Sequence, residues 1–259
     1  MTRTARIVAV ANQKGGVGKT TTALNLAVGL SQLDRDVLLI DMDPQGNCTT
    51  GLGIELEPEQ LSMAEVLLDE ASIRQVCVRP ESVSIDVAPA NQDLTSAEVS
   101  LMEHDDRANQ LKQSLRSVID EYDDVLIDCP PALNVLTLNA LTAADGVLIP
   151  MQCEYYALEG LSALIDTIEQ IQASVNPGLQ IEGLVRTMYD IRNNLSGAVA
   201  RQLAENFGDK LYRTIVPRNV RVAESPSYGE SVLTYDSESR GAMAYRGLAG
   251  EYLNRLETA

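Results

Sequence analysis

The sequence predicts an α/β fold with a single doubly wound, mostly parallel sheet and helices on both of its faces. Short apolar runs alternate along the chain with longer stretches of helical periodicity, which is typical of repeated β-α units. The runs are apolar on both faces, as strands must be when helices cover both sides of a sheet. No linker, repeat or low-complexity segment interrupts the 259 residues, so we expect residues 1–259 to form one domain.

Seven apolar runs are the expected strands, because each is short and bounded by polar or turn-forming residues. In chain order they are residues 7–11, 37–40, 82–88, 125–127, 146–150, 181–187 and 211–216. Two of these runs end in an acid, Asp41 and Asp128.

The stretches between the runs predict five helices from apolar residues at helical spacing. The first carries Ala23, Leu24, Ala27 and Val28 on its inner face. The second has its apolar positions at Leu111, Leu115, Val118 and Ile119. The five helices are expected at residues 20–32, 107–121, 158–173, 197–206 and 242–256.

Composition narrows the class of protein. Hydrophobic residues make up 45% of the chain, which is ordinary for a globular domain, and no apolar run approaches the roughly 20 residues of a bilayer-spanning helix. The amino terminus lacks the apolar segment of a signal peptide, so we expect a cytoplasmic protein with no membrane partner. Four widely spaced cysteines and a single histidine, His104, fit neither a zinc site nor a disulfide framework.

The net charge of −17 is unevenly distributed. Residues 186–259 hold ten bases and nine acids, whereas residues 1–185 hold ten bases and 28 acids. Any contact with nucleic acid is therefore expected in the last third of the chain. An acidic, solvated surface that merely thins out there is the alternative, because net charge speaks to solubility as much as to partners.

A glycine-rich loop follows the first expected strand and precedes the first helix. Its sequence, from residue 13, is Gln-Lys-Gly-Gly-Val-Gly-Lys-Thr-Thr. Glycines let successive N–H groups point at one anion, and the helix amino terminus adds a favourable dipole. Lys19 can reach the β- and γ-phosphates of a nucleotide, and the Thr20 hydroxyl can ligate Mg²⁺. The standard phosphate-loop motif has glycine at the position of Gln13 in this chain. The loop also has a second lysine, Lys14, directly after Gln13.

Carboxylates follow two of the other expected strands. Asp41 and Asp43 lie in the stretch Asp-Met-Asp-Pro-Gln-Gly-Asn, and Asp128 precedes Cys-Pro-Pro. A carboxylate beside a phosphate loop can orient a water molecule or hold a metal-bound one. Ordinary strand-to-turn boundaries, which favour Asp, Pro, Gly and Asn, are the competing interpretation.

The loop resembles the deviant Walker A signature of the ParA/MinD ATPases, and the resemblance extends from about residue 7 to residue 245. It implies a P-loop NTPase fold and an ATP site made of Lys14, Gly15, Gly16, Val17, Gly18, Lys19, Thr20 and Thr21. In that family the first lysine, here Lys14, reaches the ATP of the partner subunit. The resemblance also implies that Asp43 positions the attacking water, with Asp41 supporting it, and that Thr20 and Asp128 hold Mg²⁺.

Further stretches resemble the Soj-like chromosomal branch, among them Gln-Cys-Glu-Tyr-Tyr-Ala-Leu-Glu-Gly at 152–160 and Pro-Arg-Asn-Val-Arg at 217–221. The resemblance implies that Pro217 and Asn219 contact the adenine base, although a plain turn would look the same. It implies that Arg192 and Arg221 bind DNA without sequence preference. Arg192 could equally be an ion-pair partner of Asp190.

The function implied is that of a weak Mg²⁺-dependent ATPase. It would form an ATP-sandwich homodimer, bind nonspecific DNA in the ATP state, and hydrolyse ATP when a ParB-like partner stimulates it, in chromosome or plasmid segregation. A nucleotide switch that positions a non-DNA cargo or regulates replication initiation would share the same core. An ATP-dependent metabolic enzyme is disfavoured, because no motif for a second substrate is evident.

Overall fold

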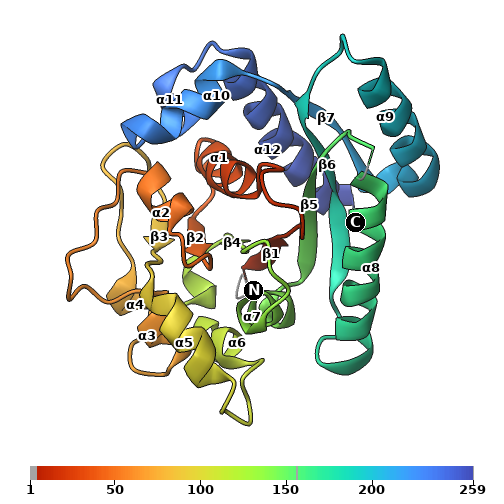
Figure 1. The fold of residues 1–259 in the computed structure, drawn as a ribbon. Coiled ribbons are helices and arrows are strands. Elements are labelled where there is room, and N and C mark those ends of the chain that lie inside the picture. Colours follow the sequence, from red (N-terminus) through yellow and green to blue (C-terminus); the bar gives the residue numbers. More distant parts are fainter. Residues whose placement is uncertain (1–4, 156, 259) are drawn as a thin grey trace.

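The computed structural model describes residues 5–155 and 157–258, which contain one seven-stranded sheet (Figure 1). All strand pairs in it are parallel, and the strand order is β3-β2-β4-β1-β5-β6-β7. The strands are β1 (Arg6–Val10), β2 (Val37–Asp41), β3 (Asp86–Ala88), β4 (Asp124–Asp128), β5 (Gly146–Gln152), β6 (Gln180–Tyr189) and β7 (Leu211–Pro217). The expected fold class is confirmed, and the sheet is parallel throughout.

Helices cover both faces of the sheet. One face carries α1 (Lys19–Ser31), α2 (Asn47–Gly51), α11 (Val232–Tyr235) and α12 (Arg240–Thr258), packed on alternate residues of the central strands. The opposite face carries α3 (Met63–Leu67), α4 (Ile73–Val76), α5 (Asp93–Leu101), α6 (Gln110–Leu115), α7 (Val135–Ala143), α8 (Ala157–Ser174) and α9 (Asn194–Phe207). A short helix, α10 (Val220–Glu224), follows β7, and single 3₁₀ turns lie at Ile119–Glu121, Gly208–Lys210 and Ser225–Tyr228.

Alternation along the strands explains the two cores. In β1, Ile7 and Ala9 face the α7 side, whereas Val8 and Val10 face α1. Each strand therefore needs apolar residues at every position, which is why the strands appear in the sequence as continuous apolar runs.

The structure corrects two of the expected elements. The helix expected over residues 107–121 is only α6 and a later 3₁₀ turn, and the strand expected over 82–88 is confined to Asp86–Ala88. Helix α7 was not anticipated, because it is buried on nearly all sides and shows no polar face from which helical periodicity could be recognised.

The order of the strands defines where a ligand can bind. Strands β4 and β1 are neighbours at the centre of the sheet. After β1 the chain continues to β2, toward the β3 edge, whereas after β4 it continues to β5, toward the β7 edge. The loops after β1 and β4 therefore diverge at the centre of the carboxyl edge. In open α/β sheets ligands bind in the crevice at such a point.

The amino edge of the sheet is fixed by buried charged groups. The carboxylate of Asp124 accepts hydrogen bonds from Arg35 Nε (2.8 Å) and from the Tyr252 hydroxyl (2.9 Å), which ties α12 to β4. At the same edge Arg6 pairs with Glu182, and Arg255 near the end of α12 donates to the carbonyl of Leu211, where β7 begins. Both Ala5 and Thr258 therefore lie at this edge.

Candidate functional site

The glycine-rich loop forms an open cradle between β1 and α1. Gly16 and Gly18 adopt left-handed backbone angles (φ of 72° and 87°), which other residues rarely adopt. No atom lies within 4 Å of where a Cβ on Gly15 or Gly16 would be, so the loop encloses open space. Gly18 caps α1, a helix of thirteen residues. The free N–H groups of its first turn and the positive end of its dipole point toward the cradle.

Neighbouring strands hold the loop in this shape. The Asn12 amide donates to the carbonyl of Pro150 (2.8 Å), and its side-chain oxygen accepts from the Lys14 N–H (3.0 Å). Thr187 on β6 donates to the carbonyl of Val17 (2.6 Å), and Gln152 on β5 donates to that of Gly16 (3.1 Å). These contacts order the cradle before any ligand binds, which lowers the cost of binding.

The two lysines of the loop have different surroundings. Lys19 is only 7% exposed; burial lowers the pKa of its ammonium, while Asp128 and Asp43 act in the opposite direction. Its Nζ lies 3.4 Å from the Lys14 carbonyl oxygen, across the mouth of the loop. Lys14 is more exposed and forms an ion pair with Glu154 (2.6 Å). The first lysine therefore contacts the loop after β5 and leaves the charge inside the cradle to the second.

Asp41 and Asp128 end the neighbouring strands β2 and β4 and stand opposite each other in the sheet register. Both are fully buried. Burial raises the pKa of the Asp128 carboxyl and the adjacent Asp41 raises it further, whereas Thr20 and Lys19 oppose the shift. Burial likewise raises the pKa of Asp41 to about 6.

Asp128 has the chemistry of a cation site. Neither of its carboxylate oxygens has a geometrically acceptable hydrogen-bond partner among the residues that the structure describes. A buried carboxylate without partners is costly, and Mg²⁺ takes hard oxygen ligands such as carboxylates and hydroxyls. The residues expected to hold Mg²⁺, Thr20 and Asp128, are therefore brought together in an arrangement that fits the ion.

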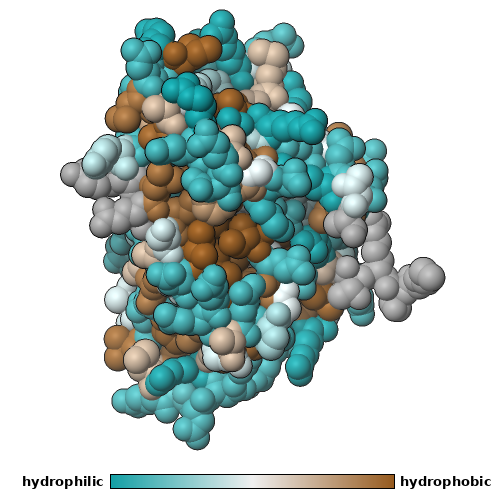
Figure 2. Space-filling model, turned by 90° about the vertical axis from the view of Figure 1, so that its right-hand side faces the viewer, coloured by the Kyte–Doolittle hydropathy of each residue, from teal (hydrophilic) through white to brown (hydrophobic). Residues whose placement is uncertain are grey.

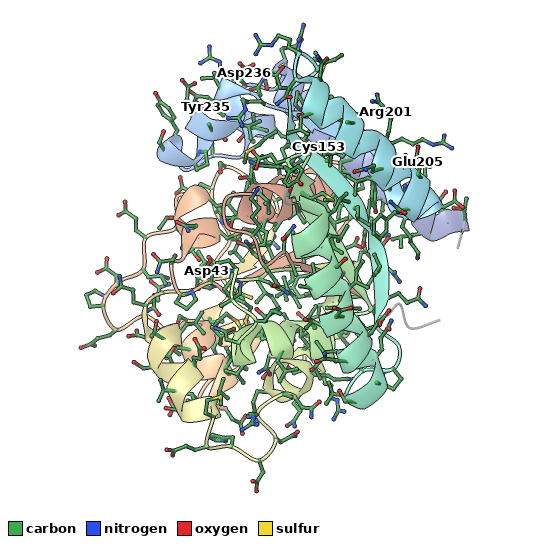
Figure 3. All side chains as sticks on the ribbon, turned by 45° about the vertical axis from the view of Figure 1, so that its right-hand side comes forward. Asp43, Cys153, Arg201, Glu205, Tyr235 and Asp236 are labelled. Atoms are coloured by element: carbon green, nitrogen blue, oxygen red, sulfur yellow. The ribbon has the colours of Figure 1, made fainter. Side chains whose placement is uncertain are left out.

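Asp43 lies on the loop between β2 and α2, at the open centre of the carboxyl edge (Figure 3). One oxygen of its carboxylate accepts from the Gln45 N–H (3.0 Å). Its charge is close enough to Lys19 and Asp128 to raise the pKa of each. The structure thus places the Asp43 charge near Lys19 and Asp128.

Pro217 and Asn219 lie at the same edge, after β7. Pro217 is in register with Tyr189 at the end of β6, and the Arg218 N–H donates to the carbonyl of Tyr189 (3.1 Å). The Asn219 oxygen caps α10 by accepting from the N–H groups of Arg221 and Val222. The side-chain oxygen is therefore committed to the helix, and the amide NH₂ group is the part available to a base.

The two arginines expected to bind DNA are exposed and paired with acids of this chain. Arg192 makes a two-pronged contact with Asp190, which lowers the pKa of that carboxyl to about 2, so the ion-pair alternative is realised. Arg221 contacts Glu224 and Asp236, and Asp236 is labelled on the upper side of Figure 3. Exposed pairs of this kind are weak, so they would not prevent an exchange of partners.

Some residues of the site had no role in the sequence interpretation. Asn12, Gln152 and Thr187 shape the loop through backbone carbonyls and N–H groups, and Thr49 donates to Asp41. Sequence spacing gives no indication of these contacts, because they join segments far apart in the chain. Glu154 lies within the stretch that resembled the Soj-like branch, but the contact with Lys14 could not be inferred from it.

Comparison with known proteins identifies the family. A family model described as an AAA domain matches residues 5–181. The chain is 50% identical over 252 residues to the chromosome partitioning protein ParA of Caulobacter vibrioides, covering 96% of this chain and 94% of the relative. The chain belongs to the ParA/Soj family of chromosome-partitioning ATPases. It is also 47% identical to the sporulation initiation inhibitor protein Soj of Bacillus subtilis, over 95% of this chain and 97% of that protein.

Solved structures agree with the ParA/Soj assignment at the level of the fold. A protein from Mycobacterium smegmatis described as cobyrinic acid a,c-diamide synthase, with a bound ATP analogue and magnesium, is 37% identical. Its TM-score is 0.86, and the match covers 98% of this chain and 96% of that one. Within the described residues no helix is long and apolar enough to cross a bilayer.

Proposed function

We propose that this ParA/Soj protein is a Mg²⁺-dependent ATPase that dimerises around two ATP molecules and binds nonspecific DNA as the dimer. A ParB-like partner would then stimulate hydrolysis and release it from DNA. The observation that carries the proposal is the convergence at one sheet edge of the open glycine cradle, buried Lys19, unpartnered Asp128 and half-buried Asp43. We take residues 1–259 to act as one ATPase domain.

The chain's own groups account for the chemistry. The N–H groups of residues 15–21 and the Lys19 ammonium would bind the phosphates, and Asp43 would orient a water toward the γ-phosphate. Thr20 and Asp128 would hold Mg²⁺, which neutralises phosphate charge when bound. Pro217 and the Asn219 amide would contact the adenine.

Lys14 would complete the site of the partner subunit. Its ion pair with Glu154 draws it away from its own cradle, and its side chain is 38% exposed. A cation supplied in trans stabilises charge on the leaving oxygens, as an arginine finger does. Dimerisation and completion of the site would then be one event, and hydrolysis would be weak without a stimulating partner.

DNA binding is assigned to Arg192 and Arg221. Arg192 lies on the loop between β6 and α9, Arg221 lies in the first turn of α10 after β7, and both are exposed. Guanidinium groups that exchange carboxylates for phosphates give sequence-independent, salt-sensitive binding. The strongly acidic remainder of the chain would increase that salt sensitivity.

The competing functions share this site. A switch that positions a protein cargo or regulates replication initiation differs only in the surface contacted. The relative from M. smegmatis carries the name of a metabolic enzyme, but relatives that are 45–50% identical are named for chromosome partitioning, and we favour that role.

The test is binding of a labelled random-sequence duplex with ATP, with ADP and without nucleotide, across a salt titration. We expect binding only with ATP, and we expect Arg192→Ala and Arg221→Ala each to weaken it and to lower the salt slope by about one. Arg116→Ala is the matched control, since Arg116 is an exposed arginine at the end of α6, outside the basic last third of the chain, and should leave binding unchanged. Intact ATP-driven dimerisation without DNA binding would favour the cargo switch instead.

A further inference from the structure

Asp41 is the centre of a buried hydrogen-bond network behind the site. One of its oxygens accepts from the Asp43 N–H (3.1 Å). The other accepts both the N–H and the hydroxyl of Thr49, at 2.9 and 2.8 Å. The Thr49 hydroxyl oxygen in turn accepts from the N–H of Ala90, at 3.0 Å. Asp41, Thr49 and Ala90 are at most 3% exposed, so water does not compete for these bonds.

The network joins three segments that are distant in sequence. Asp41 ends β2, Thr49 lies in α2, and Ala90 follows the end of β3. The loop between Asp43 and Thr49 is also pressed against this third segment, because a Cβ on Gly46 would lie 2.7 Å from the Ala90 carbonyl oxygen. The loop that carries Asp43 is thus attached at both ends and held against the end of β3 in its middle.

The Thr49 hydroxyl has a specific geometric effect. It donates to Asp41 while it accepts from Ala90, so both its proton and a lone pair are used. Together with the Thr49 N–H it fixes the plane of the Asp41 carboxylate. The remaining oxygen of Asp41 then fixes the peptide N–H of Asp43, and with it the direction in which the Asp43 side chain leaves the backbone.

We propose that Thr49 is a positioning residue for ATP hydrolysis, which acts through Asp41 to hold Asp43 in the orientation that directs water at the γ-phosphate. The inference rests on the proposed function of Asp43. Thr49 is only 1% exposed, so it would act through Asp41 rather than on the reacting groups. Groups that orient a reacting residue in this manner typically contribute 10- to 100-fold to activity.

The experiment compares Thr49→Val with Thr49→Ser and Thr50→Val. Valine keeps the shape of threonine but removes the hydroxyl, and serine keeps the hydroxyl. Thr50 is the matched control, because it is the next residue of α2, it is exposed, and its hydroxyl donates only to the Gly46 carbonyl. ATP affinity, ATP-dependent dimerisation and single-turnover cleavage of labelled ATP are measured on the full chain, with the melting temperature of each variant.

We expect Thr49→Val to lower the cleavage rate by about 10- to 100-fold and to change ATP affinity and dimerisation by less than about threefold. Thr49→Ser should cleave ATP within about threefold of wild type, and Thr50→Val at the wild-type rate. The inference is overturned if Thr49→Val cleaves ATP like Thr50→Val, if it loses ATP affinity in proportion to rate, or if serine does not restore the rate. A wild-type protein that binds ATP without cleaving it would overturn the proposed ATPase function instead.

Discussion

Within the described part of the chain, the carboxylate of Asp128 is buried in the unliganded protein without the hydrogen bonds that buried carboxylates normally have. A buried carboxylate is normally satisfied by donors, as Asp41 is by Thr49 and Asp43. Asp128 has no such donors in acceptable geometry within the described chain, although it ends a central strand. The position therefore costs local stability in the unliganded protein, as expected if its carboxylate serves the proposed Mg²⁺ site.

We predict that Asp128→Asn stabilises the unliganded protein at pH 8 by about 1–3 kcal/mol, since the substitution removes a buried carboxylate that no donor satisfies in acceptable hydrogen-bond geometry within the described chain. The folded-state pKa of Asp128 is raised, so the native state holds its proton more tightly than the unfolded chain does. The contribution of Asp128 to the free energy of unfolding of the wild type therefore falls as the pH rises above the pKa of Asp128 in the unfolded chain. The difference in stability between Asp128→Asn and wild type accordingly shrinks toward pH 4.

Urea unfolding at pH 4.5 and pH 8, without nucleotide or Mg²⁺, measures this difference. The same variant should lose Mg²⁺-dependent ATP binding. A variant less stable than wild type at both values of pH would show that Asp128 contributes to stability in the unliganded fold.

Lys14 is the other residue whose surroundings bear on function. We predict that Lys14→Ala binds ATP within about threefold of wild type but does not form the ATP-dependent dimer, since its exposed ammonium is paired with Glu154 and would serve the partner subunit's site. Light scattering with ATP measures the dimer, and Lys210→Ala, an exposed lysine at the amino edge, is the control. A dimer that persists in Lys14→Ala would rule out the assignment across subunits.

At the scale of elements, three helices begin with asparagine caps close to the functional loops. Asn134 caps α7 after the Pro-Pro turn, Asn193 caps α9 after Arg192, and Asn219 caps α10 before Arg221. The caps fix where each loop ends and the next helix begins. The directions in which the arginines project therefore depend on asparagines beside them.

Asn219 allows the cap to be separated from a role in base recognition. Asn219→Ala should lower the free energy of unfolding by about 1 kcal/mol through loss of the α10 cap. Asn219→Asp should restore that stability, because a carboxylate caps as well, but it lacks the NH₂ donor. If the amide reads adenine, both variants lose preference for ATP over GTP in competition binding; a full preference in the aspartate variant would assign Asn219 to the helix alone.

The elements recovered from sequence are those with a clear pattern. The strands were predictable because both faces of each are apolar, and α1, α8, α9 and α12 because they are long and amphipathic. The short helices α2 to α4 have too few turns to show a period, and α7 has no polar face. The phosphate loop and the strand-end acids were predictable from spacing, whereas the Thr49 and Glu154 contacts depend on the tertiary fold.

At the scale of the whole molecule, the uneven charge of the sequence becomes an uneven distribution in space. Residues 186–259 supply the end of β6, the edge strand β7 and helices α9 to α12, so the bases occupy one end of the sheet order. The face turned forward in Figure 2 is mostly hydrophilic, with an apolar area near its centre. A predominantly acidic body would repel DNA everywhere except at that end, which would orient the encounter.

The amino edge contains the ion pairs of Arg35 with Asp124 and of Arg6 with Glu182. The same edge offers positions at which a label can be attached to the protein. Ala5 precedes β1, and Thr258 ends α12 close to the start of β7, so both lie at the edge of the sheet opposite the phosphate loop, which follows β1. A fluorophore or a surface tether attached near either residue would project away from the nucleotide, from the dimer seam and from the arginine loops. Either attachment point is thus suited to following single molecules through their cycle on DNA without obstructing it.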